Sequence, residues 1–477
     1  MGDAGTKVIK KVDSLCPVCL KVIGASIVAR GDDVFLEKTC EGHGRWSVPL
    51  WRGEPRYEDW ARPKDPVQPE VLYGRVEKGK GCPYDCGLCA SHRQYPCSVL
   101  LEVTDRCNLN CPVCFADTPR DRPNAGEPPR STIAWWYDRV IQAAGPCNIQ
   151  LSGGEPTLRD DLPEIIALGV EKGFSFIQVN TNGLVIAQRS DYAGMLRDAG
   201  LSTVFLQFDG TDDRIYRELR GRPLMHEKMA AIERCAAAGL GVILVPTLAA
   251  GINTGNIGSM VRFAVKMSPV VRGIHFQPLS HFGRYPVAAY SSLRFTLPEV
   301  IRAIEEQAGD ISGKWNFLPP GTENDHCSFH GSFIVMPGGK LKCTSPSASA
   351  CCGNRDGRQG LLRTISTVAR QWSPGGACRQ PGGAAERPAG GLTEPRFSDG
   401  DVIDLDAFLQ RGRDYGFSIS CMAFQDVWNL DIERLRDCCI SIMSPDGRLI
   451  PFCAYNLTSE TGKTLYRGRF HEKDAPR

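Results

Sequence analysis

The sequence predicts an α/β fold, a partial (β/α)6 barrel with smaller cysteine-rich domains before and after it. The first observation is a rhythm: from Ser98 to about Gly309, short β-branched or aromatic runs alternate with amphipathic helical patterns. Such alternation is typical of βαβ units and a parallel sheet. The second observation is the number of units. Six of them are fewer than the eight that close a full barrel, so the barrel is expected to be partial.

The six expected strands are short apolar runs bounded by polar or turn-forming residues. They cover Val99–Val103, Asn148–Leu151, Ser175–Asn180, Thr203–Phe208, Gly241–Pro246 and Gly273–Pro278. Helical patterns lie between them, as in Asp161–Lys172 and Met225–Ala238. Because the carboxyl ends of parallel strands meet at one edge, the loops after these strands are expected to build an active site.

The regions outside the barrel are expected to be less regular. Residues 1–97 carry two groups of cysteines, with little regular structure expected in the Trp- and Pro-rich stretch from Trp46 to Pro69. Residues 98–310 form the barrel, and residues 311–477 form a C-terminal region. Within that region, residues 353–400 hold many Gly and Pro residues and are expected to be a loose insertion.

The composition indicates a globular protein whose cysteines bind metal. The formal net charge is only +2, from 56 basic and 54 acidic residues, so no nucleic-acid partner is expected. No apolar run is long enough for a membrane span, and the N-terminus lacks a signal-peptide core, so a cytoplasmic location is expected. The 21 cysteines are too many for a reduced protein unless they bind metal, and many lie two or three residues apart.

The most informative motif is Thr104-Asp-Arg-Cys107-Asn-Leu-Asn-Cys111-Pro-Val-Cys114-Phe115, which follows the first barrel strand. Three cysteines in one loop can bind three irons of a 4Fe–4S cluster and leave the fourth iron open. A zinc site is the alternative, but it would require a fourth ligand nearby. The motif resembles that of the radical S-adenosylmethionine (SAM) superfamily. This resemblance implies that SAM chelates the open iron and is cleaved to methionine and a 5′-deoxyadenosyl radical.

A second motif, Leu151-Ser152-Gly153-Gly154-Glu155-Pro156, follows the next strand. It resembles the superfamily's Gly-Gly-Glu-Pro element, which binds the amino group of SAM. Glycines allow the backbone to approach a ligand closely, and a carboxylate suits an ammonium group. The ordinary alternative is a simple strand-to-helix turn, but the position behind the cysteine loop favours the cofactor-binding interpretation.

Polar residues end the third and fourth strands. Asn180 and Asn182 lie in Val179-Asn-Thr-Asn-Gly183, and Gln207 and Asp209 lie at the end of the fourth strand. The superfamily resemblance implies that such positions face the ribose or carboxylate of SAM, or in part the substrate. The alternative, that they cap strands and turns, stays open.

A second C-x3-C-x2-C group, Cys82, Cys86 and Cys89, lies upstream of the barrel without a preceding apolar strand. Cys97 lies a short loop beyond and could supply a fourth thiolate. We therefore predict a fully ligated auxiliary 4Fe–4S cluster, with a zinc site on the same thiolates as the alternative.

At the N-terminus, Cys16-Pro-Val-Cys19 pairs with Cys40-Glu-Gly-His43 about 20 residues later. Two such knuckles are typical of a tetrahedral structural site for zinc or mononuclear iron. The cysteines of the C-terminal region are scattered, so their spacing decides little. We predict that Cys327, Cys421, Cys438 and Cys453 bind a second auxiliary cluster, and that Cys147 and Cys235 are buried apolar residues.

The whole layout resembles the archaeal tetraether lipid synthases and their bacterial relatives, a group also classed as class D radical methyltransferases acting on a pterin precursor. The resemblance rests on both upstream cysteine groups and on three further segments: Leu206-Gln-Phe-Asp-Gly210, Arg220-Gly-Arg222 and Pro445-Asp-Gly-Arg-Leu-Ile-Pro-Phe-Cys453. The Gly- and Pro-rich segment and the cysteines from Cys343 to Cys378 depart from the family's pattern.

Two activities follow from this resemblance. The main expectation is radical coupling of lipid alkyl chains, which requires an apolar channel and contact with a membrane surface. The alternative is methyl transfer to a pterin or similar heterocycle, which requires only a pocket. An electron donor such as ferredoxin or flavodoxin is implied in both cases. A non-catalytic electron carrier is disfavoured because a carrier needs no Gly-Gly-Glu-Pro element, and tRNA modification is disfavoured because no basic, aromatic-rich patch is evident.

Overall fold

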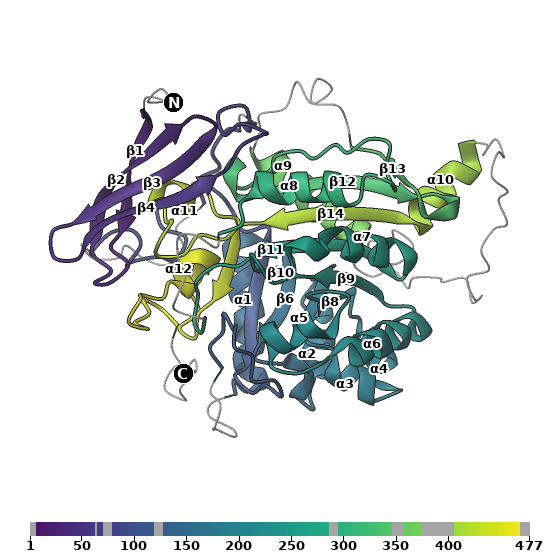
Figure 1. Ribbon diagram of the computed structural model, residues 1–477. Coiled ribbons are helices and arrows are strands. Elements are labelled where there is room, and N and C mark those ends of the chain that lie inside the picture. The colour runs from purple at the N-terminus through teal and green to yellow at the C-terminus, as the bar shows by residue number, and fades with distance from the viewer. Residues whose placement is uncertain are drawn as a thin grey trace.

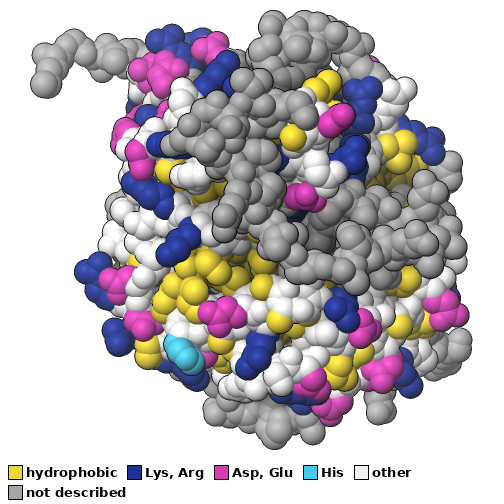
Figure 2. Space-filling model, turned by 90° about the vertical axis from the view of Figure 1, so that its right-hand side faces the viewer, with side chains coloured by type: hydrophobic (Ala, Val, Ile, Leu, Met, Phe, Trp, Pro, Cys, Tyr) yellow, Lys and Arg dark blue, Asp and Glu magenta, His cyan; other side chains and the backbone are white. Residues whose placement is uncertain are grey.

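The computed structural model describes residues 6–62, 64–69, 79–118, 127–285, 294–345, 357–373 and 405–467. These residues form a small N-terminal sheet and a large mixed sheet (Figure 1). No described helix is both long and apolar enough to cross a membrane. On the face seen in Figure 2, acidic and basic side chains are interspersed, as the near-zero net charge leads one to expect.

The N-terminal sheet is an antiparallel meander, purple in Figure 1. Its strands are β1 (Lys7–Leu15), β2 (Val22–Arg30), β3 (Asp33–Cys40) and β4 (Gly44–Trp51). Alternate residues of β3, such as Val34 and Leu36, are buried, which is the pattern of a strand with one covered face. Strand β4 runs into the stretch from Trp46 where little regular structure was expected, so that prediction was wrong for Trp46–Trp51.

Six parallel strands form the centre of the large sheet, which confirms the expected α/β barrel core. They are β5 (Ser98–Thr104), β6 (Asn148–Gly153), β7 (Ile177–Thr181), β8 (Thr203–Gln207), β9 (Gly241–Val245) and β11 (Val271–Pro278). The helices between them are α1 (Arg130–Ala144), α2 (Leu162–Glu171), α3 (Leu184–Gln188), α4 (Tyr192–Ala199), α5 (Asp213–Arg220), α6 (Met225–Ala238) and α7 (Ile257–Lys266). The short strand β10 (Thr247–Leu248) pairs with β11.

The two faces of these strands differ in polarity. Residues such as Val99, Leu151 and Val204 point outward and are fully buried in the main apolar core. The alternate positions point into the barrel and carry mainly polar side chains. The polar ones that line the interior cavity are Ser98, Asn148, Gln150, Ser152, Gln178, Asn180, Gln207, His275 and Gln277, and the apolar ones are Leu100, Phe205 and Val245.

The C-terminal region extends the barrel sheet at both edges. Beside β11 lies the parallel strand β14 (Gly416–Met422), followed by the antiparallel strands β12 (Ser328–Val335) and β13 (Leu341–Cys343). Beside β5 lies the parallel strand β15 (Ile440–Met443), followed by antiparallel β16 (Leu449–Pro451). Residues 423–439, which contain α11 (Ile432–Arg436), therefore connect one edge of the barrel to the other. The remaining C-terminal helices are α8 (Leu297–Gln307), α10 (Leu405–Asp414) and α12 (Phe452–Asn456).

Helix α9 (Gly357–Trp372) corrects the prediction that residues 353–400 are a loose insertion. It contacts β9, β11 and β14, and its last residue packs inside the barrel. The Trp372 ring lies 5.5 Å from the Phe205 ring and 6.2 Å from the His275 ring, and its Nε1 donates to Ser418 Oγ at 3.1 Å. Residues 353–356 and 374–400 lie outside the described part of the chain.

Candidate active site

The cysteine loop directly follows β5, where the sequence places it. Cys107, Cys111 and Cys114 are all half-buried and line one cavity of about 700 Å³. Burial raises the pKa of Cys107 to about 12, so its thiol loses a proton only when a metal compensates the charge. The loop after β11 holds this segment, because Cys114 N donates to Arg284 O at 2.8 Å and Arg284 Nε donates to Cys111 O at 2.9 Å.

The Gly-Gly turn packs directly against the start of the cysteine loop. Gly154 N donates to Thr104 O at 2.8 Å, and Glu155 N donates to Arg106 O at 2.7 Å. A Cβ on Gly153 would lie 2.1 Å from Thr104 O, and one on Gly154 would lie 2.1 Å from Arg106 O. Gly153 also has φ of 120°, which side chains rarely adopt. Both glycines are therefore required for the two loops to meet.

The Glu155 carboxylate is already paired within the protein. Its Oε1 accepts from Thr157 Oγ1 and Thr181 Oγ1, both at 2.6 Å, and its Oε2 accepts from Asn182 N at 2.7 Å. Burial raises the pKa of Glu155, while these hydrogen bonds oppose that shift. Glu155 thus ties the turn to the end of β7, which leaves the backbone of the turn as the part best placed to meet an amino group.

Asp209 is likewise occupied, by an arginine that the sequence interpretation did not assign to the site. Arg220 Nε and its second guanidinium nitrogen each donate to Asp209 at 2.7 Å. Burial alone would lower the pKa of Arg220, but Asp209 raises it above its usual value and keeps the guanidinium charged. Arg220 also donates to Val113 O at 3.1 Å and lines the cavity beside Cys111.

Gln207 and Asn182 take part in a second buried network. Lys228 is fully buried, and its Nζ donates to Asn182 O at 2.6 Å and to Gln207 Oε1 at 2.8 Å. Burial lowers the pKa of Lys228 to about 8. Asn182 Nδ2 donates to Asn108 Oδ1 of the cysteine loop at 2.7 Å. Asn182 therefore links the third strand to the loop, whereas Asn180 faces the barrel interior.

The N-terminal knuckles come together as predicted from their spacing. Cys16 and Cys19 lie in the turn between β1 and β2, Cys40 ends β3, and His43 lies in the turn between β3 and β4. Their ligand atoms all lie within 4.8 Å of one another, the one such group among the described residues. His43 Nδ1 is 3.4 Å from Cys40 Sγ and 3.6 Å from Cys16 Sγ. This set fits a single tetrahedral ion such as zinc.

Cys97, the fourth thiolate predicted for the upstream cysteine group, has a close neighbour outside that group. Cys82, Cys86 and Cys89 interact with one another, and Cys86 is deeply buried. The Sγ atom of Cys97 lies 3.1 Å from Cys439 Sγ, a neighbour that the spacing did not suggest. The parallel pairing of β15 with β5 produces this contact, because Ser98 stands opposite Ile440.

Of the cysteines predicted for the second auxiliary cluster, three converge. Cys327, Cys438 and Cys453 interact with one another in a buried region, and Arg434 donates to Cys327 Sγ at 3.2 Å. Cys421 is fully buried within β14, paired with Phe276 and Phe329 in the apolar core. Cys147 and Cys235 are buried, as expected.

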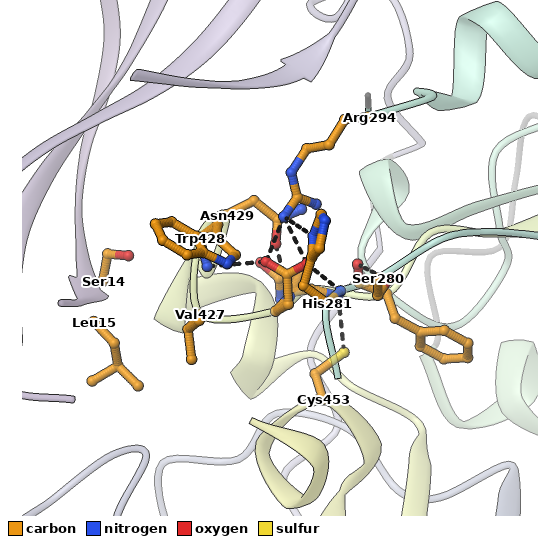
Figure 3. Close-up of polar contacts among 12 residues, drawn as sticks. Ser14, Leu15, Ser280, His281, Arg294, Val427, Trp428, Asn429 and Cys453 are labelled. Carbon is orange, nitrogen blue, oxygen red and sulfur yellow. Dashed lines mark hydrogen bonds and ion pairs between the residues drawn. The ribbon is translucent and has the colours of Figure 1, made fainter. Parts of the chain in front are cut away.

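A buried ion-pair network joins the loop after β11 to the segment 423–439 (Figure 3). Asp426 receives hydrogen bonds from Arg294 at 2.6 Å, from His281 N at 2.7 Å and from Trp428 N at 2.9 Å. Burial alone would raise the pKa of Asp426, but Arg294 and His281 lower it well below its usual range. Lys38 of β3 donates to Val427 O at 2.6 Å, so the N-terminal sheet reaches the same segment.

Comparisons with known proteins agree with this geometry. The family model described as the radical SAM superfamily matches residues 101–264, and the "HMPTM N-terminal zinc ribbon domain" matches residues 8–52. The chain is 32% identical to the 7,8-dihydro-6-hydroxymethylpterin dimethyltransferase of Methanocaldococcus jannaschii, over 97% of this chain and 95% of that protein.

Other similarities cover smaller parts of the chain. The chain is 31% identical to a probable GTP 3′,8-cyclase of Methanothermobacter marburgensis, over 38% of this chain and 58% of that protein. Among solved structures, Streptococcus suis SuiB bound to SAM matches at 16% identity with a TM-score of 0.38, covering 46% of this chain and 48% of that one.

Proposed function

Because this chain belongs to the radical SAM superfamily, we propose that it is a radical SAM methyltransferase whose substrate is a reduced pterin. The observation that carries the proposal is the similarity to the dihydropterin dimethyltransferase, which extends over nearly the full length of both chains. The similarity includes the N-terminal metal domain, so it is not limited to the barrel that many radical enzymes share.

The polarity of the barrel interior supports a heterocyclic substrate. Amide side chains of β6, β7 and β8 line the cavity, including Asn148, Gln150 and Gln178. Gln150 and Gln178 bond to neighbouring side chains, but Asn148 Oδ1 is buried and has no partner among the described residues, and a lipid alkyl chain would leave it unpaired at a cost of about 1–3 kcal/mol. A pterin carries ring nitrogens, an amino group and a carbonyl that can pair with these amides. Because Leu100, Phe205 and Trp372 line the same cavity, the interior favours a flat ligand with a polar edge.

The expectation of lipid coupling has no such support. Of the large apolar side chains exposed among the described residues, only Phe115 lines the cavity, so no apolar rim marks its mouth there. None of the relatives compared above is named as acting on a lipid. The alternative stated from the sequence, methyl transfer to a pterin, is the better supported of the two.

The roles of this chain's residues follow from their positions. Three half-buried thiols at one cavity wall, Cys107, Cys111 and Cys114, fit a 4Fe–4S cluster with an open iron. With SAM bound, that group supplies a 5′-deoxyadenosyl radical. The Gly153–Glu155 turn receives the SAM amino group, and Arg220 offers a fixed positive charge to its carboxylate or to the cluster. Trp372 closes the barrel and excludes water from the radical.

The other metal sites are proposed as follows. Cys16, Cys19, Cys40 and His43 bind one zinc or iron ion that stabilises the N-terminal sheet. Cys82, Cys86 and Cys89 bind one auxiliary 4Fe–4S cluster, and Cys327, Cys438 and Cys453 contribute to a second. An external protein such as ferredoxin or flavodoxin supplies the electron for SAM cleavage.

Mass spectrometry of cell extracts tests the choice of substrate. Pterins and lipids are extracted from cells with the gene, without it, and with a Cys107→Ala copy. We expect pterins heavier by one or two methyl groups only where the intact gene is present, with lipids unchanged. Gene-dependent coupled lipids with unaltered pterins would refute the proposal.

A further inference from the structure

Four polar side chains of β5, β6 and β7 form a continuous hydrogen-bonded chain inside the barrel. Gln178 Nε2 donates to Asn180 Oδ1 at 3.1 Å, and Asn180 Nδ2 donates to Gln150 Oε1 at 3.2 Å. Gln150 Nε2 then donates to Ser98 Oγ at 3.0 Å. All donors point the same way along this chain, which we call the amide chain. Its direction fixes which atom of each amide remains available to a ligand.

The amide chain ends in the Gln178 carbonyl, which accepts no hydrogen bond from the part of the chain that the structure describes. Gln178 is 1% exposed. A second such carbonyl lies one strand away, because Asn148 Oδ1 is buried and has no hydrogen-bond partner in the described structure. Both residues line the cavity, and Gln150, two residues from Asn148, stands directly opposite Gln178 in the β6–β7 pairing. Buried polar atoms are rarely left unpaired, so the unpaired Asn148 Oδ1, with the Gln178 carbonyl lining the same cavity, points to a ligand that offers two donors.

We propose that Asn148 and Gln178 recognise the 2-amino-4-oxopyrimidine edge of the substrate, an inference that rests on the proposed function. This edge carries two adjacent donors, the 2-amino group and the ring N3–H, which suit the two carbonyl acceptors. It also carries a carbonyl acceptor, for which Gln150 retains one N–H, since an amide has two and only one is used. The GTP on which the named cyclases act contains the same edge, so the chemical class agrees with both kinds of relative.

This assignment also orients the ring toward the cysteine loop. Asn148 begins β6 and Gly153 ends it, a separation of about 17 Å at 3.3 Å per residue. With its pyrimidine edge at Asn148 and Gln178, a pterin directs its second ring toward the Gly153–Glu155 turn and the three cysteines. The carbons that are to be modified then lie nearest the bound SAM.

Equilibrium binding of two probes tests the inference on full-length, cluster-loaded protein with SAM. The probes are 7,8-dihydro-6-hydroxymethylpterin and its 2-oxo analogue, in which a carbonyl replaces the 2-amino group. We expect the unaltered protein to prefer the 2-amino compound by at least about tenfold. Gln178→Leu and Asn148→Leu should each weaken binding of the pterin about fivefold to thirtyfold and reduce the preference below about threefold.

Two further variants separate recognition from folding. Gln178→Glu keeps the size of the side chain and its acceptor toward the ligand but removes the Nε2 donor to Asn180, so it should bind the pterin more weakly yet still exclude the 2-oxo analogue. A misfolded protein would bind neither. Gln142→Leu removes an exposed amide of α1 and should change neither affinity. If the leucine variants keep the unaltered preference, the inference is wrong while the proposed function stands. If the unaltered protein binds no pterin at all, the proposed function itself fails.

Discussion

The three cysteines of the loop after β5 share one chemical task, and none has a substitute nearby. Cys107→Ala, Cys111→Ala and Cys114→Ala each remove one of the three thiols at this wall of the cavity. We expect each variant to lose 5′-deoxyadenosine formation from SAM with dithionite under anaerobic conditions. The iron bound at the other sites should persist, which elemental analysis can measure. Formation of 5′-deoxyadenosine at the unaltered rate by any of the three would contradict the assignment.

His275 makes the free energy of unfolding depend on pH in a defined range. Burial lowers the pKa of His275 to about 4, so the unfolded chain binds more protons than the folded one between about pH 4 and 6.5. The free energy of unfolding therefore rises with pH through this window and falls on acidification.

Between pH 7.5 and pH 5 the His275 contribution amounts to about 2 kcal/mol. Anaerobic urea denaturation of the unaltered protein and of His275→Phe at both pH values measures it. The histidine protein should lose more stability than the variant by that amount. Equal losses in the two proteins would mean that the imidazole is not buried in its neutral form.

For single residues, the sequence predicted where in the fold a side chain lies more reliably than which residues it bonds to. The superfamily resemblance implied that Glu155 binds the amino group of SAM and that Asp209 faces SAM or in part the substrate, with capping of the strand end as the alternative for Asp209. The structure pairs Glu155 with Thr157 and Thr181, and Asp209 with Arg220. A carboxylate's partner depends on residues that folding brings near, and Arg220 is eleven residues from Asp209 in the chain. The spacing of residues within one motif does not reveal which residues from elsewhere in the chain will bond to them.

We expect a bound metal to stabilise the N-terminal sheet, because its four ligands come from the β1–β2 and β3–β4 connections and would hold them together. Binding of a structural metal contributes on the order of 10 kcal/mol to the folding of such small domains. Cys19→Ser in the full chain should therefore lose one zinc or mononuclear iron per molecule. The midpoint of thermal unfolding monitored from this sheet should fall as well. Unchanged metal content in the variant would argue against the site.

Trp372, the last residue of α9, is expected to keep water out of the barrel interior. Trp372→Ala removes the ring that packs on Phe205 and His275 and should reduce the free energy of unfolding by about 2 kcal/mol. Because water then reaches the cavity, more 5′-deoxyadenosine should form per molecule of product. The control Trp372→Phe keeps an aromatic ring and should remain close to the unaltered ratio. An unchanged ratio in the alanine variant would show that α9 does not seal the barrel.

Helices and strands with a regular apolar pattern could be predicted from the sequence, whereas those whose pattern is interrupted by Gly, Pro or Trp could not. The six barrel strands lie where alternating apolar runs occur in the sequence. Helix α9 was not predicted because Gly and Pro residues around it dominate the composition of residues 353–400. Strand β4 was missed in part because Trp and Pro in its second half are typical of loops.

In the whole molecule, the C-terminal region completes the barrel by pairing with both of its edges. Strand β14 joins β11 and β15 joins β5, so the segment between them brings Cys438 and Cys439 to sites formed by distant parts of the chain. Cys97 and Cys439 are 342 residues apart in sequence and 3.1 Å apart in space. The grouping of the N-terminal knuckles was predictable because it is local, whereas this contact depends on the order of strands in the sheet.

The central claim is that this radical SAM enzyme acts on a pterin. Its most direct test is an anaerobic reaction of the reconstituted protein with SAM as radical source, a reductant, a separate methyl donor (further SAM or a reduced pterin that carries a one-carbon unit) and either 7,8-dihydro-6-hydroxymethylpterin or an extract of membrane lipids. The products are analysed by mass spectrometry. We predict that the pterin stimulates formation of 5′-deoxyadenosine and is itself converted to a product heavier by a methyl group, while Cys107→Ala yields neither. Recovery of the pterin unchanged, together with modified lipid chains, would contradict the claim.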